Sequence, residues 1–272
     1  MSSRIAIIGA GTIGQTIVSS LLRSQIFKPS EIIATARSDA RRQKIADEFG
    51  VETTADNGRA VASADIVLVA VKPLQVAGVI ACVANQIQER HCLISVAAGV
   101  RTSDIESLLD RSVAVVRAMP NTPCLLQVGM TAVCAGRFAT PSQVESVEKI
   151  FKTMGRTVVL EEHLMEAATG LGASGPAFIY LVIDALADGG VKAGLSRRVS
   201  LEMAAQATLG AAKMVLDLGQ HPAILKDAVT TPAGCTIDGL LALEDGKLRM
   251  TLINAVINAT TRAQQLAKPA KI

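Results

Sequence analysis

The sequence predicts an α/β protein in two parts: a doubly wound sheet over residues 1–161, followed by an all-helical domain over residues 162–272. In the first part, short β-branched runs alternate with amphipathic helical segments, as a parallel sheet with crossover helices requires. From His163 onward the strand pattern stops, and long alanine-rich helical segments replace it. The length of 272 residues is enough for two ordinary domains or one large one.

The first domain is expected to contain seven strands and six helices. The strands cover residues 4–9, 31–36, 65–71, 91–97, 113–119, 129–135 and 156–161. The helices fit between them, over residues 12–24, 38–49, 56–62, 74–88, 103–110 and 141–154. The fifth of these helices carries a capping-box signature, because Ser103 is followed three residues later by Glu106.

The second domain is expected to consist of helices alone, over residues 163–194, 197–218, 222–227, 234–243 and 247–267. Gly194, Gly219 and Gly246 lie where three of them would end, in agreement with the preference of glycine for the residue after a helix. These helices have more apolar surface than the first domain alone can cover. We therefore expect a homo-oligomer built from dimers through the helical domain, with a self-contained bundle as the alternative.

Composition argues against nucleic-acid and membrane partners. Aromatic residues are only 2% of the chain, with no Trp, whereas recognition of single-stranded nucleic acid depends on aromatic stacking. The net charge is +3, and the longest basic cluster, Arg41, Arg42 and Lys44, is interleaved with acidic residues. We interpret that cluster as a solvated helix face, because such partners need a concentrated basic patch.

The five cysteines and the chain start favour a reducing, cytoplasmic location. Five is an odd number and the cysteines form no CxxC pair, so we expect neither a disulfide framework nor a metal site. The start "MSSRIAIIGAG" leaves no room for a leader before the first strand. The apolar segment 167–183 contains glycines and a proline and is shorter than the roughly 20 residues of a membrane span. We expect it to be a buried helix of a soluble protein.

"IAIIGAGTIGQTI" (5–17) contains a GxGxxG motif between the first strand and the first helix. Gly9 permits the tight turn, Gly11 lets the backbone approach a pyrophosphate, and Gly14 allows close contact of helix and sheet. The motif alone is common. Because a strand, a helix and a second strand follow the spacing of a Rossmann-type domain, we expect a dinucleotide site here.

The end of the second strand favours NADPH over NADH, although NADH remains possible. A ribose 2′-hydroxyl is usually bound by an acidic residue at this point, but the sequence has Arg37 and Ser38. Both can bind a 2′-phosphate. The alternative is that Ser38 caps the next helix while Arg37 is solvated, and the two roles are compatible.

Two further strand ends should face the same crevice. "AVKP" puts Lys72 and Pro73 after the third strand, and "SVAAGV" puts Ala98 after the fourth, where small residues let a nicotinamide ring approach. Lys72 has an alternative interpretation as an ordinary surface lysine.

With these motifs, "RAMPNTP" (117–123), "GLGASGPAFIY" (170–180) and "HPAILKDAVTTPAGCTIDGLLALE" (221–244) complete a pattern that runs through nearly the whole chain. The sequence resembles the Δ1-pyrroline-5-carboxylate reductase family. The resemblance implies reduction of (S)-1-pyrroline-5-carboxylate to L-proline, the last step of proline biosynthesis.

The motifs and the resemblance together give the candidate cofactor residues Gly9, Ala10, Gly11, Thr12, Ile13, Gly14, Thr35, Arg37, Ser38, Asn57, Val71, Lys72, Pro73, Ala98 and Asn121. The resemblance also implies that the segment 231–236 of the helical domain binds the substrate at a dimer interface. Its candidate substrate-binding residues are Thr231, Gly234, Cys235 and Thr236.

The segment 231–236 is a Pro-Ala-Gly turn that enters a helix. Such a turn presents free N–H groups, expected from Gly234, Cys235 and Thr236, and the helix dipole favours a carboxylate there. Thr236 is the candidate catalytic residue, hydrogen-bonded to the substrate nitrogen. Its alternative is a helix cap or first-turn residue. Cys235 has no neighbouring base in sequence, so we do not expect a covalent nucleophile.

The sequence departs from the family pattern at four positions. Thr231 stands where Ser is common, Cys235 where a small residue or Thr is found, Phe178 where many relatives have Tyr, and Gly219 where some have Glu. Thr231 keeps the hydroxyl and Cys235 keeps its backbone N–H, so substrate binding should survive.

Three other functions are alternatives for this sequence: a reductase of another cyclic imine acid, a 3-hydroxyacid-dehydrogenase-like enzyme, and a non-catalytic NADP-binding regulator. A lysine on the first long helix of the second domain would mark the hydroxyacid class. The first lysine there is Lys192, at the far end of the helix, and this favours imine chemistry.

Overall fold

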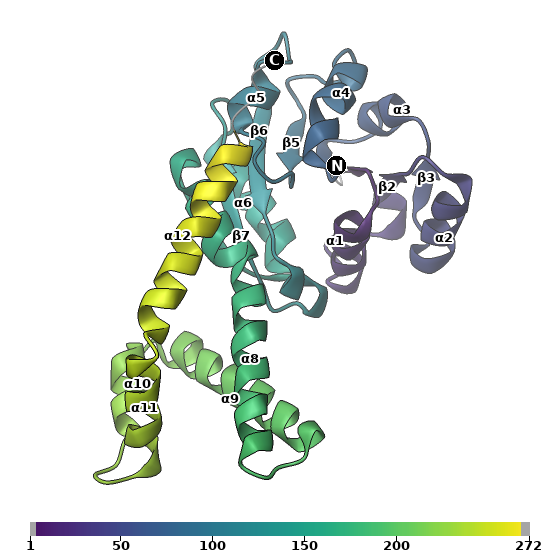
Figure 1. Ribbon diagram of the computed structural model, residues 1–272. Coiled ribbons are helices and arrows are strands. Elements are labelled where there is room, and N and C mark those ends of the chain that lie inside the picture. Colours follow the sequence, from purple (N-terminus) through teal and green to yellow (C-terminus); the bar gives the residue numbers. More distant parts are fainter. Residues whose placement is uncertain (1–3, 268–272) are drawn as a thin grey trace. The chain divides into compact units, whose positions relative to one another are not determined.

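The computed structural model describes residues 4–267 and divides into two compact units (Figure 1). The first unit contains the residues up to Ser174 together with those from Asn258 onward, and the second contains Gly175–Ile257. Residues 1–3, part of the sequence that argued against a leader, lie outside the described residues.

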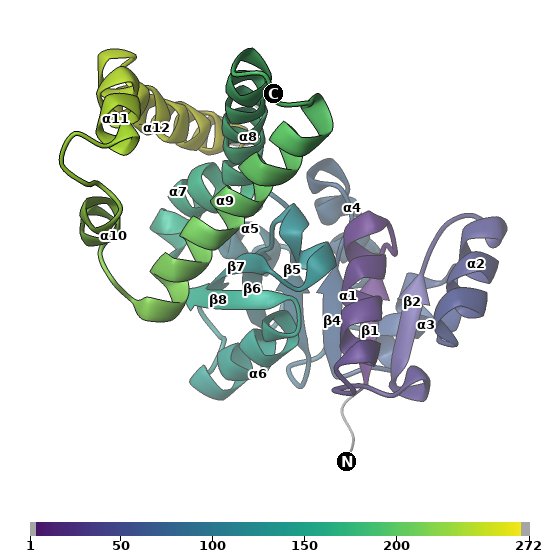
Figure 2. The ribbon, with the colours of Figure 1, turned by 90° about the horizontal axis from the view of Figure 1, so that it is seen from below.

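The first unit is built on one eight-stranded sheet in the order β3-β2-β1-β4-β5-β6-β7-β8 (Figure 2). The strands are β1 (Ile5–Ile8), β2 (Ile32–Thr35), β3 (Glu52–Thr54), β4 (Ile66–Val69), β5 (Cys92–Ser95), β6 (Ala114–Met119), β7 (Gly129–Ala135) and β8 (Gly155–Val159). All neighbouring pairs are parallel except β6 and β7. The predicted doubly wound α/β fold is confirmed.

Both faces of the sheet are covered by helices. These are α1 (Thr12–Arg23), α2 (Asp39–Phe49), α3 (Asn57–Ala62), α4 (Pro73–Val83), α5 (Thr102–Glu106) and α6 (Pro141–Lys152). In β1, Ile5 and Ile7 join a core cluster with α1, α2 and α6, whereas Ala6 and Ile8 join a second cluster with α3, α4 and α5. Successive strand residues point to opposite faces, so a fully apolar strand fills both cores.

Two features of the sheet differ from the prediction. Strand β3 is a short strand at the edge of the sheet and was not predicted. Its first two residues, Glu52 and Thr53, are polar and half-buried, so they give no apolar pattern. Strand β7 runs antiparallel to β6. The connection between them holds only a short 3-10 helix, Thr122–Leu126, which is too short for the crossover that a parallel pair needs.

The capping box predicted for helix α5 is wrong. The helix begins at Thr102, and its N-cap residue is Arg101, whose backbone N–H donates to the Asp104 carboxylate at 3.0 Å. The carboxylate of Glu106 instead accepts the backbone N–H of Arg137 at 2.7 Å. The contact of Glu106 with the distant Arg137 therefore replaces the local capping box predicted with Ser103.

The second unit is helical, as predicted. Its elements are α8 (Gly175–Lys192), α9 (Arg197–Leu218), α10 (Pro222–Ala228), α11 (Cys235–Asp245) and the first part of α12 (Leu248–Leu266). Gly219 ends α9 in the left-handed region with φ +65°, as expected of a C-terminal glycine. Gly246 ends α11 with φ −71°, and the positive φ of 56° falls on Lys247 instead.

The helix expected at 163–194 is interrupted before α8. A 3-10 turn (Glu162–Leu164), the short helix α7 (Met165–Ala168) and a π-helix (Thr169–Ala173) precede it. A side chain at Gly170 would meet the Thr260 hydroxyl at 2.3 Å, so the π-helix lies against the C-terminal part of α12. Such π-helical turns often accompany functional sites.

The apolar run that contains residues 167–183 is longer and more exposed than predicted. Among the described residues, the helical stretch Glu162–Lys192 has the length and composition to cross a membrane, and only 11% of its most apolar window is buried. Core helices of soluble proteins can have the same length and composition. In this chain by itself, Leu181 is 71% exposed, so the expected burial is not reached within one chain.

His91, just before β5, makes the stability of the fold depend on pH. Its Nδ1 accepts the backbone N–H of Gln88 at 2.7 Å, so this nitrogen carries no proton. Burial and then the charge of Arg90 lower the pKa of His91, and the smaller opposing effects include Asp65. Because the unfolded chain then takes up the proton first, the contribution of His91 is present above about pH 6.5 and lost as the pH falls below it.

We therefore expect wild-type protein to lose more unfolding free energy than His91→Gln between about pH 7.5 and about pH 5.5, in urea titrations at each pH. His163→Gln is the control, because the His163 side chain is 68% exposed, and it should follow the wild type. An equal pH dependence in His91→Gln and wild type would contradict this assignment.

Candidate active site

A cavity of about 880 Å³ lies at the carboxyl ends of β1, β2 and β4. This is the end of an open α/β sheet at which ligands bind. Its lining residues are Ile8, Gly9, Ala10, Gly11, Thr35, Ala36, Arg37, Ser38, Arg41, Ala55, Asn57, Ala70, Val71, Lys72, Gln75, Gly78 and Val79. Three of these residues are basic and none is acidic, so the cavity suits a polyanion.

The glycine turn between β1 and α1 forms the floor of this cavity. Gly9 has φ +89°, and a Cβ there would lie 2.5 Å from Cγ1 of Val71. Its N–H donates to the hydroxyl of Thr35 at 3.0 Å, and the N–H of Ala10 donates to the Thr35 carbonyl at 2.8 Å. Helix α1 begins at Thr12 with Gly11 as its N-cap, so its first N–H groups have no partners within the helix and can face an anion.

Gly11 separates the cofactor role of the turn from its folding role. A Cβ at Gly11 would meet nothing within 4 Å in the protein itself, and the φ of −77° suits any residue. Gly11→Ala should therefore fold with an unchanged thermal midpoint. It should nevertheless weaken NADPH binding by about tenfold or more, because a methyl group would occupy the path of the pyrophosphate.

Fluorescence titration with NADPH measures this effect. Gly210→Ala in α9, which also has open space for a Cβ, is the matched control and should bind as wild type does. Wild-type affinity for NADPH in Gly11→Ala would contradict the placement of the pyrophosphate at this turn.

The turn after β2 contributes Arg37 and Ser38 to the cavity. Ser38 is also the N-cap of α2, since its hydroxyl accepts the N–H of Arg41 at 3.4 Å. The capping role of Ser38, the alternative given above, is therefore confirmed, and Ser38 lines the cavity as well. Arg41 lines the cavity too, although the sequence pattern suggested a solvated helix face.

On the other side, Val71 and Lys72 line the cavity at the end of β4, and Asn57 lines it from the start of α3. Pro73 starts α4 after Lys72 and is not in the lining, and its contact with a cofactor stays a prediction. Thr12, Ile13, Gly14 and Ala98 are also outside the lining. Their contact with a cofactor stays a prediction.

Asn121, after β6, is held within the protein. Its Oδ1 accepts the backbone N–H of Met130 at 3.0 Å, and its Nδ2 donates to the carbonyl of Gly172 at 2.9 Å. The amide thereby anchors the π-helix to the loop that follows β6. It lies outside the cavity lining, and contact with the cofactor stays a prediction.

The predicted substrate segment forms the entrance to α11. Gly234 is the N-cap, and Cys235 and Thr236 are the first two helical residues, so Thr236 is a first-turn residue and not the cap. The N–H of Gly234 donates to the Thr231 carbonyl at 3.1 Å and is not the free donor that we expected. The N–H groups of Cys235 and Thr236 have no partner within the helix.

Close packing shapes this turn. A Cβ at Gly234 would lie 2.4 Å from the hydroxyl of Thr231, so glycine brings that hydroxyl against the backbone. Ala233 has φ +57°, a conformation that favours glycine. A residue with a side chain pays a free-energy cost to hold this conformation, so the surrounding turn must fix it.

A buried ion cluster near β6 was not predicted from the sequence. Arg117 is 1% exposed, and its Nη1 donates to Oε1 of Glu162 at 2.8 Å and to Oε1 of Glu166 at 3.1 Å. The other oxygen of Glu162 accepts the N–H and hydroxyl of Thr102 at 3.1 and 2.5 Å. This cluster fastens the segment before the π-helix to the sheet.

The cluster has clear electrostatic consequences. Burial alone would raise the pKa of Glu162, but hydrogen bonds from Thr102 and Arg117 outweigh burial and lower it. Burial, followed by the neighbouring Glu162 charge, raises the pKa of the Cys134 thiol to about 12. The thiol therefore stays protonated at neutral pH.

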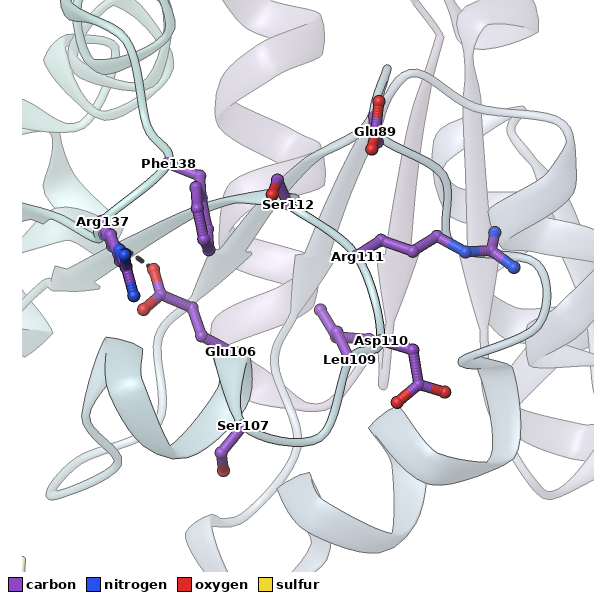
Figure 3. Close-up of a pocket in the computed structure, with 9 residues that line it drawn as sticks. All are labelled: Glu89, Glu106, Ser107, Leu109, Asp110, Arg111, Ser112, Arg137 and Phe138. Carbon is purple, nitrogen blue, oxygen red and sulfur yellow. Dashed lines mark hydrogen bonds between the residues drawn. The ribbon is translucent and has the colours of Figure 1, made fainter.

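A second cavity, of about 500 Å³, lies at the opposite end of the sheet (Figure 3). Its residues precede β6 or follow the antiparallel strand β7, at the end away from the glycine turn. Arg137 lies over the ring of Phe138, with its guanidinium carbon 5.3 Å from the ring centre, while Arg111 extends away and donates to the Ile87 carbonyl at 2.8 Å. Its charged side chains are exposed, and it lies at the end of the sheet opposite to the one where α/β proteins bind ligands. It is therefore a weaker candidate for the active site than the cavity over the glycine turn.

No metal site is evident among residues 4–267, where no three His, Cys, Asp or Glu side chains cluster as ligands would. The five cysteines are free thiols, and Cys235 is exposed at the start of α11.

The doubly wound sheet, the glycine turn and the basic cavity define a pyridine-nucleotide-dependent oxidoreductase. Residues 4–99 match the family model described as NADP oxidoreductase, coenzyme F420-dependent. Residues 162–266 match the model for pyrroline-5-carboxylate reductase dimerisation.

The chain belongs to the pyrroline-5-carboxylate reductase family. It is 39% identical over 267 residues to the pyrroline-5-carboxylate reductase of Methanosarcina acetivorans, covering 98% of this chain and 99% of the relative. A pyrroline-5-carboxylate reductase structure from Coxiella burnetii matches with a TM-score of 0.94 and 34% identity, over 99% of this chain and 100% of that one. The Plasmodium falciparum pyrroline carboxylate reductase with NADP bound has a TM-score of 0.86 and 27% identity, over 98% of both chains.

Proposed function

We propose that this protein reduces (S)-1-pyrroline-5-carboxylate to L-proline by hydride transfer from NADPH, the last step of proline biosynthesis. The observation that carries the proposal is the basic, carboxylate-free cavity over the glycine turn, in a chain of the pyrroline-5-carboxylate reductase family. The segment 231–236, to which the family resemblance assigns the substrate, leads into the start of α11.

NADPH is the preferred cofactor in this proposal, and NADH is a possible weaker one. Arg37, Arg41 and Lys72 supply positive charge in the cavity, and no carboxylate lines it to bind an unmodified ribose. The Plasmodium falciparum relative carries NADP in its structure, which supports the same class of cofactor.

The start of α11 binds the substrate carboxylate in this proposal. The backbone N–H groups of Cys235 and Thr236 are the donors, and the partial positive charge of the helix N-terminus favours an anion there. Thr231 adds its hydroxyl. Gly234 acts through its lack of a side chain, which lets that hydroxyl lie against the turn.

The chemistry needs a hydride on the imine carbon and a proton on the imine nitrogen. Bound NADPH supplies the hydride. A cyclic iminium is already electrophilic, so the protein needs mainly to orient the reactants and to offer a hydrogen bond to the nitrogen. Thr236 takes that role. Its hydroxyl is a weak acid, and it stabilises the amine as it forms or positions a water that protonates it.

Residues 1–161 serve as the NADP-binding domain, and residues 162–272 as the substrate-binding and dimerisation domain, in a cytoplasmic homo-oligomer built from dimers. The match to the dimerisation model supports this assembly. Of residues 175–257, only Ala187, Ser200 and Ala204 are buried, while large apolar side chains such as Leu181 and Leu209 are exposed. A second copy would cover them. No nucleic acid or membrane takes part.

An absorbance assay of NADPH oxidation tests the function. Purified protein is supplied with pyrroline-5-carboxylate, a six-membered cyclic imine acid, or a 2-keto acid. Preferred turnover of pyrroline-5-carboxylate supports the proposal. Preference for either other substrate would replace it with a different reductase, and NADPH binding without turnover of any substrate would indicate a regulator.

A further inference from the structure

The chain crosses between the two units at two points. It leaves the first unit after Ser174 and returns to it at Asn258. The π-helix Thr169–Ala173 lies directly before the first crossing, and Thr260 lies just after the second. A Cβ at Gly170 would lie 2.3 Å from the Thr260 hydroxyl and 2.8 Å from its backbone nitrogen. The two chain segments next to the crossings are therefore packed against each other within the first unit.

The helix α7, which leads into the π-helix, is fixed on the sheet. Met165 is fully buried in a small core cluster with Ala132 and Cys134 of β7. The carboxylate of Glu166 accepts a hydrogen bond from the buried Arg117 of β6 at 3.1 Å. The π-helix thus extends from a fixed point on the sheet to the first crossing.

Asn121 holds the far end of the π-helix. In an α-helix the carbonyl of Gly172 would accept the N–H four residues further on, but that residue is Pro176, which has no N–H. The Nδ2 of Asn121 donates to this carbonyl at 2.9 Å. Its Oδ1 accepts the N–H of Met130, at the start of β7, at 3.0 Å. One side-chain amide therefore replaces the helical hydrogen bond and ties the π-helix to the sheet.

This amide lies at the edge of the sheet where the reaction is proposed to occur. Asn121 comes two residues after the end of β6, which runs parallel to β5 and, through it, to β4. The carboxyl ends of these strands share one edge with the cavity over the glycine turn. The cavity belongs to the first unit, and the substrate segment 231–236 belongs to the second.

The crossing therefore matters for the rate of the reaction. Hydride transfer needs the reacting atoms about 3–3.5 Å apart, and a misplacement of about 1 Å can cost about 100-fold in rate. A contact that fixes the chain where it leaves the cofactor unit can set this distance without touching either reactant.

We propose that Asn121 is a positioning residue for hydride transfer, because its amide holds the π-helix, and with it the crossing to the second unit, in the arrangement that the reaction needs. This rests on the proposed function, since it concerns the hydride transfer of that reaction. Asn121 acts through the backbone of Gly172 and leaves the binding of NADPH unchanged.

Asn121→Leu keeps the approximate shape of the side chain and removes both hydrogen bonds. It should lower kcat for pyrroline-5-carboxylate about tenfold and change the Kd of NADPH, measured calorimetrically, by less than about twofold. Hydrogen exchange followed by mass spectrometry should become about tenfold faster in residues 168–175 and stay unchanged in β1 and β4. Asn85→Leu, the same substitution at an exposed turn residue after α4, should match the wild type in all three measurements.

Gly170→Ala disturbs the other contact of the π-helix, because its methyl group would collide with Thr260. It should give the same pattern as Asn121→Leu, with a lower kcat and wild-type affinity for NADPH. Gly210→Ala in α9, where a Cβ has open space, is its matched control and should keep the wild-type kcat.

The proposal is overturned if Asn121→Leu keeps the wild-type kcat, or if its exchange is unchanged in residues 168–175 or rises equally in β1 and β4. A loss of NADPH affinity as large as the loss of kcat would also overturn it, and would make the amide a ligand of the cofactor instead. Absence of turnover in the wild type would overturn the proposed function. The exchange measurement needs no substrate, so it would still decide whether Asn121 holds the π-helix.

Discussion

Thr236→Val is expected to lower turnover of pyrroline-5-carboxylate about 100-fold, the range typical of a group that assists proton transfer. Valine keeps the shape of threonine and removes the hydroxyl proposed to hydrogen-bond the imine nitrogen. Thr236 is not the N-cap and forms no side-chain capping bond in α11, so folding should not depend on it. Steady-state kinetics should show the loss mainly in kcat, and calorimetric titration should show unchanged NADPH binding.

Thr251→Val is the matched control for this change. Thr251 is likewise a threonine of a helix in the second unit, although it is exposed where Thr236 is half-buried. Its hydroxyl donates to the Lys247 carbonyl at 3.1 Å, outside the substrate segment. It should keep wild-type turnover, and both variants should keep the wild-type mass in solution. Full turnover in Thr236→Val would remove Thr236 from the mechanism.

Arg117→Met is expected to cost about 3–5 kcal/mol of unfolding free energy, the usual effect of removing one partner of a buried ion cluster. The side chain is 1% exposed and holds the carboxylates of Glu162 and Glu166. Without it, two neighbouring carboxylates would lose their cation. Chemical denaturation at one fixed protein concentration measures the change, since the stability of an oligomer depends on concentration.

Two further variants separate this mechanism from a simple packing loss. Adding Glu162→Gln and Glu166→Gln to Arg117→Met should recover a large part of the lost stability, because no charge is then left unpaired. Arg198→Met breaks a pair whose side chains are 83% and 74% exposed, and it should cost less than about 1 kcal/mol. A cost for Arg117→Met no larger than that for Arg198→Met would contradict the role of the cluster.

Much of the fold was predictable because the strands are buried on both faces. Ile5–Ile8 is a continuous apolar run, and the residues alternate between the two cores. Strand β3 was not predictable by the same reasoning, because an edge strand of three residues with Glu52 at its start needs little apolar surface. The direction of β7 depends on the length of its connection, which hydrophobic pattern does not report.

The parts of the candidate site that directly follow a strand in the sequence were predictable. The glycine turn and the Arg37–Ser38 pair follow a strand directly, so their place in the crevice follows from sequence order. Arg41 was missed because its sequence neighbours are charged and its contact with the cavity depends on the cap geometry of α2. Arg117 was missed because its partners Glu162 and Glu166 lie 45 and 49 residues away.

Transfer of deuterium from NADPH that carries deuterium in place of both hydrogens on the reactive carbon of its nicotinamide tests the central claim most directly. Wild-type protein incubated with this cofactor and pyrroline-5-carboxylate should yield L-proline with a single deuterium on the ring carbon that was the imine carbon, seen by mass spectrometry and NMR. Unlabelled proline, or label in a different product while pyrroline-5-carboxylate remains unchanged, would contradict the assignment of this chain as a pyrroline-5-carboxylate reductase.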